Sequence, residues 1–195
     1  IGRDFIKKDK VALILGDNFF YGQSLSALLL NSVKLKLGAT IFLNKVKNPE
    51  LYGVAKINRK KIYNLKEKPK KNFSNFAITG LYFFDNKVKN LSKNLKKSKR
   101  GELEILDLLK IYNSKNKLNF RLLGRGSVWL DTGSINDFYN ASSFVNTIEN
   151  RQGFKIACLE EIAFNNKWIT KKHITNAIKF YGNCEYSKYL KNYIK

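Results

Sequence analysis

Near its start the chain has an apolar run that ends abruptly in polar residues. Residues 11–15 read VALIL, and a short β-branched run of this kind predicts a strand buried on both faces in a parallel sheet. After a predicted turn at GDN, apolar residues recur at helical spacing up to Val33, with Ser24 as the expected N-cap and Gly38 as the expected stop. A second strand is predicted over 39–46. Strand, helix and strand thus follow one another at the length of one βαβ unit.

The pattern changes beyond residue 50. Residues 53–58 and 61–68 alternate apolar and polar side chains around a short polar link, which predicts an antiparallel hairpin with one face in water. Residues 76–84, FAITGLYFF, predict another buried strand. The later predicted elements are helices over 86–97 and 102–113, strands over 117–124 and 127–133, and a long amphipathic helix from Ser134 with Asp137 in a capping box.

These elements predict an α/β layer structure with an antiparallel insertion. The 195 residues, 44% of them hydrophobic, can bury one core of ordinary size. The sequence contains no internal repeat, no low-complexity linker and only two prolines, so we expect a single domain over 1–195. Because the sequence has no Met, we also expect Ile1 to be an internal residue of a longer protein.

The chain is strongly basic, with 37 Lys and Arg against 15 Asp and Glu and a formal charge of +22. Such a charge raises nucleic acid or an anionic membrane as a partner. The cations are scattered over every predicted element, however, and the chain is also rich in Asn, Ile, Phe and Tyr. We therefore favour compositional drift and expect neither a nucleic-acid nor a membrane partner; attraction of a polyphosphate ligand is compatible with this interpretation.

The cysteines, the histidine and the hydropathy point to a protein of the cytoplasm. Cys158 and Cys184 lie far apart with no CxxC pairing, which fits reduced thiols better than a disulfide framework. His173 has no partner at metal-ligand spacing and is expected on a surface or a helix. No apolar run approaches the roughly 18 residues that a membrane span needs.

Two predicted strands end in a carboxylate, at Asp17 in LILGDN and at Asp131 in VWLDTG. Ligands of open α/β sheets bind at the carboxyl ends of strands, so the two side chains can share one hard cation if their strands are close. Mg²⁺ takes one or two protein carboxylates, with water and substrate phosphate completing its shell. The alternative is that both acids simply belong to turns, which favour Gly, Asp and Asn.

Further groups are suited to a phosphorylated sugar. Gly53 lets a ring approach the main chain, Glu67 is an acceptor for hydroxyl groups, and Lys68 and Arg100 are cations for phosphate. Taken singly, Glu67 and Lys68 are equally well explained as the solvated edge of a hairpin.

Six motifs in order carry a resemblance to a known family. They are LGDNFFYG, NPELYGVAKI, KEKPKKNFSNFAITGLYFFD, KRGELEILDLLKIY, GRGSVWLDTGS and NRQGFKIACLEEIAF. In this order and spacing they resemble the glucose-1-phosphate thymidylyltransferases, sugar nucleotidyltransferases of the dTDP-rhamnose pathway, and the similarity runs over nearly the whole chain.

The resemblance implies a fold, a reaction and an assembly. The fold would be α/β, with a Rossmann-like nucleotidyltransferase mixed sheet, inserted antiparallel sugar-binding hairpins and C-terminal helices. In the reaction, the phosphate of glucose 1-phosphate attacks the α-phosphorus of dTTP in line, and pyrophosphate leaves. Members are usually homotetramers, and some are inhibited by the end product at a surface site to which Tyr21 and Gly22 would contribute.

The resemblance also assigns residues. Asp17 and Asp131 would hold Mg²⁺, and Asn18 would lie beside the nucleotide. Gly53, Glu67 and Ile78 would line the glucose pocket, with Ile78 where the family usually has Val. Lys68 and Arg100 would hold the phosphate of glucose 1-phosphate, and Asp17, Lys68 and Arg100 would be the catalytic set.

One departure from the family is large. The Gly-rich loop GGxGTRLxPxT and the segment that reads the base are not among the 195 residues. We therefore expect these residues to be the C-terminal two-thirds of a single nucleotidyltransferase domain. The alternatives are a related UTP-dependent sugar-phosphate nucleotidyltransferase, a non-catalytic paralogue that binds sugar phosphate without turnover, and a basic nucleic-acid binder with steeply salt-dependent affinity.

We predict that the 195 residues on their own are inactive and poorly stable. The Gly-rich loop cradles the triphosphate and its Arg stabilises developing charge, and missing strands leave an open sheet edge. A turnover assay on the isolated chain checks this, and formation of dTDP-glucose from dTTP and glucose 1-phosphate would refute it.

Overall fold

The protein is described here from a computed structural model covering residues 3–34, 36–70, 73–98 and 101–195. The chain divides into two compact units, Ile1–Ser134 and Ile135–Lys195, and each is described by itself. The expectation that all of 1–195 belongs to one nucleotidyltransferase domain stays a prediction. Within the described ranges, no helix is both long enough and apolar enough to cross a membrane.

The first unit contains every strand of the described chain. The strands are β1 (Val11–Ile14), β2 (Asn18–Tyr21), β3 (Ala39–Lys45), β4 (Gly53–Asn58), β5 (Lys61–Glu67), β6 (Phe76–Phe84), β7 (Leu118–Leu122) and β8 (Val128–Asp131). Its helices are α1 (Arg3–Ile6), α2 (Leu25–Val33), the 3₁₀ turn η1 (Pro49–Leu51), α3 (Val88–Ser92) and α4 (Ile105–Ser114).

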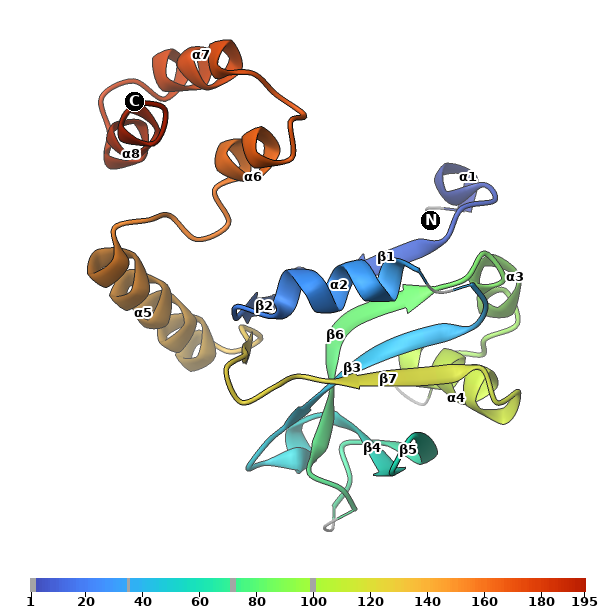
Figure 1. The fold of residues 1–195 in the computed structure, drawn as a ribbon. Coiled ribbons are helices and arrows are strands. Elements are labelled where there is room, and N and C mark those ends of the chain that lie inside the picture. Colours follow the sequence, from blue (N-terminus) through green and yellow to red (C-terminus); the bar gives the residue numbers. More distant parts are fainter. Residues whose placement is uncertain (1–2, 35, 71–72, 99–100) are drawn as a thin grey trace. The chain divides into compact units, whose positions relative to one another are not determined.

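A mixed sheet with β6 at its centre organises this unit. The strand order is β5-β4-β6-β3-β7, and β1 pairs with β6 beyond the end of β4. Strands β3, β4 and β1 all run antiparallel to β6, whereas β7 runs parallel to β3, with Ala39 opposite Leu118 (Figure 1). This arrangement confirms the mixed α/β fold.

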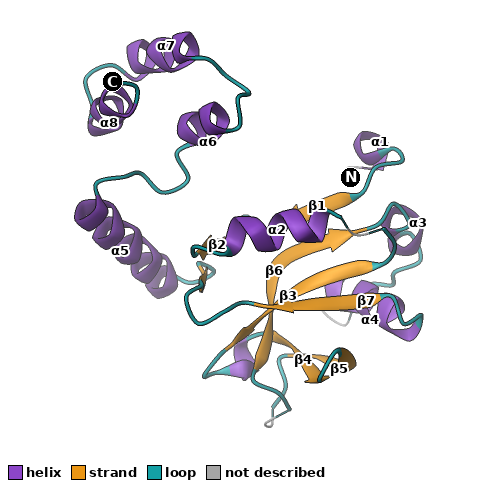
Figure 2. Ribbon diagram, in the orientation of Figure 1, coloured by secondary structure: helices purple, strands orange, loops and turns teal. Residues whose placement is uncertain are grey.

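Helices cover both faces of the sheet (Figure 2). Alternating side chains of β3 and β6 point to opposite faces, as the two-residue period of a strand requires. On one face Ile41, Tyr82 and Phe84 pack with Leu109 and Tyr112 of α4. The other face has a smaller cluster formed by Phe42, Leu81 and Phe83, against which Leu28 and Leu29 of α2 pack.

A buried carboxylate connects three parts of the first unit. Asp85 is 2% exposed and follows directly after β6. Its Oδ2 accepts a hydrogen bond of 2.7 Å from the N–H of Gly38, and its Oδ1 accepts one of 2.8 Å from the hydroxyl of Tyr112 and one of 3.1 Å from the N–H of Lys87. Burial and the bond to Asp85 raise the pKa of Tyr112, so the hydroxyl remains a donor.

The second unit is helical. It consists of α5 (Ile135–Gln152), α6 (Leu159–Asn165), α7 (Lys171–Tyr181) and α8 (Glu185–Tyr193). The last three pack around Cys158, Ile174 and Leu190. Both cysteines are free thiols, as expected, and His173 lies in the first turn of α7, where its ring pairs with Thr170 in a capping box. The long helix predicted from Ser134 is confirmed as α5.

Most of the predicted elements are present, and three predictions are wrong in detail. The run 11–15 forms an exposed strand antiparallel to β6 instead of a buried strand in a parallel sheet, because among the described strands it pairs on one edge only. The turn predicted at GDN was expected to lead directly to the helix α2. The structure has an additional strand, β2, which begins at Asn18 and precedes α2. The helix predicted over 86–97 is limited to α3, because beyond it the N–H groups of Asn94 and Leu95 bond to carbonyls three residues back, as in turns, instead of four.

We predict that Asp85→Asn lowers the free energy of unfolding of the first unit by about 2 kcal/mol or more. An amide has one acceptor oxygen, so its NH₂ group must face at least one of the three donors and leave it unpaired in a buried site. Hydrogen exchange of the β6 amides checks this, and the matched change Asp107→Asn, at an exposed carboxylate paired with Lys110, is expected to alter their protection little. Equal protection in both variants would contradict the role given to Asp85.

Candidate active site

A two-stranded sheet brings Asp17 and Asp131 together. Strands β2 and β8 pair antiparallel with Asn18 opposite Asp131. Thr132, which follows β8, donates hydrogen bonds from its N–H (2.7 Å) and its Oγ1 (2.9 Å) to the carbonyl oxygen of Asp17. The two acids that end separate runs in the sequence are therefore neighbours, as their predicted pairing required.

The two carboxylates border the same small space beside Gly133. A Cβ atom built on Gly133 would lie 3.1 Å from Oδ1 of Asp131 and 4.0 Å from Oδ2 of Asp17. Oδ1 of Asp131 accepts a hydrogen bond of 2.9 Å from the N–H of Gly133, and Oδ1 of Asp17 accepts one of 2.8 Å from Nδ2 of Asn18. One oxygen of each carboxylate is thus fixed by a hydrogen bond. Because Gly133 has no side chain, the space between the two carboxylates stays open.

This donor set fits a hard divalent cation such as Mg²⁺. Two carboxylates that converge on one space are what Mg²⁺ takes from a protein when water and substrate phosphate supply the other ligands. In the part of the chain that the structure describes, no group of three or more His, Cys, Asp or Glu side chains could hold a metal ion by itself. The geometry is therefore suited to a cation shared with a phosphorylated ligand, more than to a closed structural site.

The amide of Asn18 is engaged with protein groups at both ends. Its Oδ1 accepts hydrogen bonds of 3.0 Å from the N–H of Gly80 and 2.6 Å from Nε1 of Trp129, while its Nδ2 donates to Asp17. Asn18 therefore ties β2 to β6 and β8 and orients the carboxylate next to it. The expectation that Asn18 lies beside the nucleotide stays a prediction.

A cavity of about 230 Å³ brings most of the predicted site residues together. Seven of them line it, namely Asp17, Asn18, Gly53, Glu67, Lys68, Ile78 and Asp131. Arg100, the eighth, lies outside the described residues. Residues from 17 to 131 in the sequence thus converge on one space, because β2, β8, the β4–β5 hairpin and β6 meet there.

The hairpin places its three predicted residues in register. Gly53 and Glu67 face each other at the open end of β4 and β5, and the N–H of Lys68 donates to the carbonyl of Tyr52 at 3.0 Å. A Cβ atom on Gly53 would lie 2.9 Å from Oε2 of Glu67, so a side chain at this position would displace the carboxylate. The backbone of Lys68 has φ 38°, which turns the chain out of the strand at this point.

The sequence reasoning missed several residues that line the cavity. Gly80 and Tyr82 lie on the same face of β6 as Ile78, two and four positions further on, and Trp129 lies two positions before Asp131 on β8. The two-residue period of a strand would have identified them once Ile78 and Asp131 were chosen. Burial, and then the nearby charges of Glu67 and Asp17, raise the pKa of Tyr82, so its hydroxyl stays protonated.

Comparison with known proteins defines the class of protein to which this fold and site belong. Residues 1–148 match the family model described as nucleotidyl transferase, which is well over half of the chain. The chain therefore belongs to the nucleotidyl transferase family.

Within that family the chain is similar to proteins of one kind. It is 43% identical over 196 residues to the glucose-1-phosphate thymidylyltransferase of Neisseria meningitidis serogroup A, covering 100% of this chain and 68% of that protein. It is 40% identical to the glucose-1-phosphate thymidylyltransferase of Mycobacterium tuberculosis over 97% of this chain and 66% of that protein. The chain thus spans about two-thirds of the length of these relatives.

Solved structures agree with the fold. A crystal structure of a Bacillus anthracis glucose-1-phosphate thymidylyltransferase in complex with sucrose matches with a TM-score of 0.66 and 36% identity, covering 73% of this chain and 57% of that one. A UDP-glucose pyrophosphorylase complexed with UDP-glucose also reaches 0.66, at 21% identity, over 75% of this chain and 59% of that one. The second likeness concerns the fold alone.

We predict that Asn18→Ala lowers the free energy of unfolding of the first unit by about 2–3 kcal/mol. The change leaves the N–H of Gly80 and the indole N–H of the buried Trp129 without their acceptor, and a buried donor left unpaired costs about 1–3 kcal/mol. Urea unfolding followed by Trp129 fluorescence, in a Trp168→Phe background, reports the effect. The matched change Asn94→Ala, at an exposed residue, is expected to stay within about 0.5 kcal/mol; a similar loss in both variants would contradict the prediction.

Proposed function

We propose that this chain is the greater part of a glucose-1-phosphate thymidylyltransferase, which transfers a thymidylyl group from dTTP to glucose 1-phosphate and releases pyrophosphate. The observation that carries the proposal is the convergence on one cavity of seven residues that the family resemblance assigns to the site, with two carboxylates close to Gly133. Identity of 43% to a protein of that name supports the choice of substrates.

In the proposed reaction a phosphate oxygen of glucose 1-phosphate forms a bond to the α-phosphorus of dTTP. The bond between that phosphorus and the bridging oxygen to the β-phosphate breaks, and pyrophosphate leaves with the electron pair. Such a transfer depends on positioning and on stabilisation of charge more than on covalent chemistry by the protein. The ammonium group of Lys68 and the guanidinium group of Arg100 are proposed to bind the sugar phosphate and hold the attacking oxygen in line.

Asp17 and Asp131 are proposed to hold Mg²⁺, which would neutralise charge on the triphosphate and on the leaving pyrophosphate. The hydrogen bonds from Asn18 and Gly133 hold Oδ1 of Asp17 and Oδ1 of Asp131 in place. The shared space beside Gly133 is bordered by Oδ2 of Asp17 and by Oδ1 of Asp131. The protonated hydroxyl of Tyr82 adds no negative charge to a cavity that already contains Glu67 and Asp17.

The sugar is proposed to lie over Gly53, between Glu67 and Ile78. The lack of a side chain at Gly53 and the apolar side chain of Ile78 admit a ring, and the Glu67 carboxylate can accept hydrogen bonds from its hydroxyl groups. The tilted pair formed by Tyr52 and Trp129, with ring centroids 5.0 Å apart, forms part of the same wall.

The setting of the enzyme belongs to the same proposal. We infer a cytoplasmic enzyme of the dTDP-rhamnose pathway that acts as a homotetramer and has no nucleic-acid or membrane partner. A UTP-dependent relative is the main alternative, since the segment expected to read the base is not among these residues. Comparing kcat/KM for dTTP and UTP in the complete protein discriminates the two, and a preference for UTP would replace the proposed substrate.

We predict that Asp17→Asn in the complete protein lowers kcat by on the order of 10² or more, since loss of one preorganised electrostatic group has effects of this size. It should also raise the Mg²⁺ concentration that gives half-maximal rate. Steady-state assays of dTDP-glucose formation across a Mg²⁺ titration measure both effects.

The matched control is Asp9→Asn, an exposed carboxylate outside the cavity, which should leave kcat and the Mg²⁺ dependence unchanged. If Asp17→Asn and the unaltered protein reach half-maximal rate at the same Mg²⁺ concentration, Asp17 is not a ligand of the proposed metal site.

A further inference from the structure

A second cavity of the first unit lies apart from the candidate active site. It measures about 560 Å³ and shares no lining residue with the first cavity. Its walls come from the C-terminal end of α2, from β3 and β7, and from the turn between β4 and β5. The lining residues are Asn31, Ser32, Lys34, Thr40, Arg59, Lys60, Asn119, Phe120 and Arg121.

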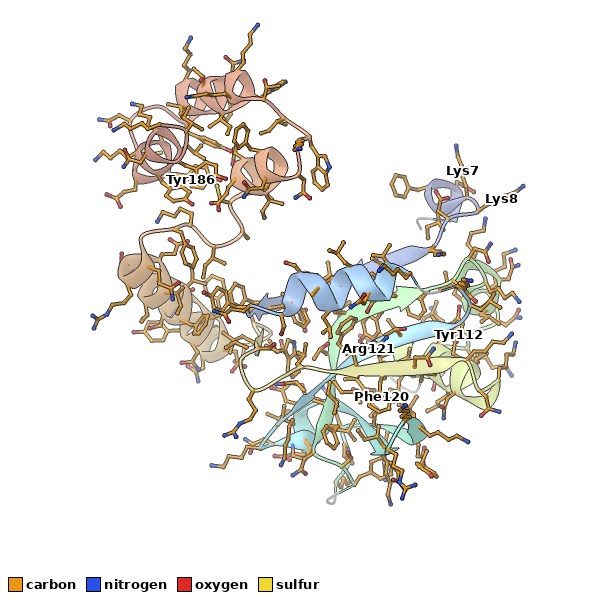
Figure 3. All side chains as sticks on the ribbon, viewed as in Figure 1. Lys7, Lys8, Tyr112, Phe120, Arg121 and Tyr186 are labelled. Atoms are coloured by element: carbon orange, nitrogen blue, oxygen red, sulfur yellow. The ribbon has the colours of Figure 1, made fainter. Side chains whose placement is uncertain are left out.

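The topology of the sheet brings these residues together. Thr40 on β3 is opposite Asn119 on β7, and Phe42 is opposite Arg121, so Thr40, Asn119 and Arg121 share the sheet face that α2 covers. Figure 3 labels Arg121 on β7, next to Phe120, which belongs to the other face. Strand β5 contacts β7, and this curl of the sheet carries the β4–β5 turn to the cavity.

The charge of this lining is of one sign. It contains four cations, Lys34, Arg59, Lys60 and Arg121, and no carboxylate. Among the described residues, none of the four forms an ion pair with an Asp or Glu. The partial negative charge at the C-terminal end of a helix, roughly half a unit charge, is small against four full positive charges.

The kind of cation distinguishes this cavity from the general basicity of the chain. Only six of the 37 cationic residues are arginines, and two of the six line this one cavity. A guanidinium group offers a planar fork of donors that matches phosphate oxygens in two-point contacts, which a lysine ammonium group does not. Asn31, Ser32, Thr40 and Asn119 add neutral polar groups that can bond further oxygens.

We propose that this cavity is a binding site for a chain of phosphates, either the triphosphate group of a nucleotide or free polyphosphate, separate from the site of transfer. A volume of about 560 Å³ is within the roughly 300–1,000 Å³ usual for small-molecule sites and is sufficient for a nucleoside triphosphate. Arg59 and Arg121 bind phosphate oxygens from two sides, and Lys34 and Lys60 supply further positive charge. The site is independent of the proposed transferase activity.

The test is calorimetric titration of the complete protein with inorganic tripolyphosphate at 0.15 M salt, where weak surface attraction is screened. The variant Arg59→Asn/Arg121→Gln is expected to raise the Kd at this site at least tenfold. Asn suits position 59 because the backbone there has φ 48°, a conformation that Asn adopts more readily than most residues. Both arginines are exposed, so circular dichroism should show an unchanged fold.

The matched control is Lys96→Gln/Lys97→Gln, which removes the same charge from exposed positions outside the cavity and should change the Kd less than twofold. Equal weakening by both double variants, or no binding at millimolar tripolyphosphate, would overturn the proposal. A further variant, Asn119→Asp, puts a carboxylate into the cavity without touching an arginine and should also weaken binding.

Titrations with ATP and dTTP distinguish the two sources of phosphate. If the natural ligand is a nucleotide, the nucleotides bind more tightly than tripolyphosphate and lose affinity in Arg59→Asn/Arg121→Gln. If it is free polyphosphate, tripolyphosphate binds at least as tightly as they do. If Asp17→Asn raises the Kd of the nucleotides and Arg59→Asn/Arg121→Gln does not, the nucleotides bind at the transfer site. That result counts against the proposal.

Discussion

The hydrogen bonds of one amide side chain hold the candidate active site together. Asn18 is the first residue of β2, a strand of the small sheet, yet its Oδ1 accepts from the backbone of β6 in the large sheet and from the indole of Trp129 on β8. Its Nδ2 donates to Asp17. Because three strands and one carboxylate meet at a single side chain, the position of Asp17 follows from the relative position of the two sheets.

The hydrogen bond from the N–H of Gly80 to Asn18 requires a glycine in β6. A Cβ atom on Gly80 would lie 2.6 Å from Cγ of Asn18, closer than any side chain allows. The glycine in the middle of an otherwise bulky buried strand costs stability in itself, since glycine loses more backbone entropy on folding and contributes no packing. It is tolerated because it lets the amide approach the backbone, and the neighbouring Leu81, Tyr82, Phe83 and Phe84 supply the burial that the strand needs.

Much of this arrangement could be predicted from the sequence, and the parts that could not have physical reasons. The hairpin, β3, β6, α2 and α5 follow from hydrophobic period and turn residues, which are local signals. The partner of a strand is not a local property, so VALIL gave a strand but neither its antiparallel pairing nor its exposure. Strand β2 was missed because its four residues follow a strong turn signal and pair with β8, their partner among the described strands, more than a hundred residues later.

The same distinction applies to the two cavities. Asp17 and Asp131 could be paired from the sequence because carboxylates at strand ends indicate shared chemistry, and their convergence beside Gly133 supports that reasoning. Arg59 and Arg121 gave no such signal: one lies in a turn of a lysine-rich hairpin and the other in an alternating strand. Arg59 and Arg121 line the same cavity because the sheet curls and brings β5 against β7. In a chain this basic, positive charge indicates a binding site only where the fold gathers several cations around one concave surface. A ligand bound there forms several contacts at once, and together these offset the entropy that it loses on binding.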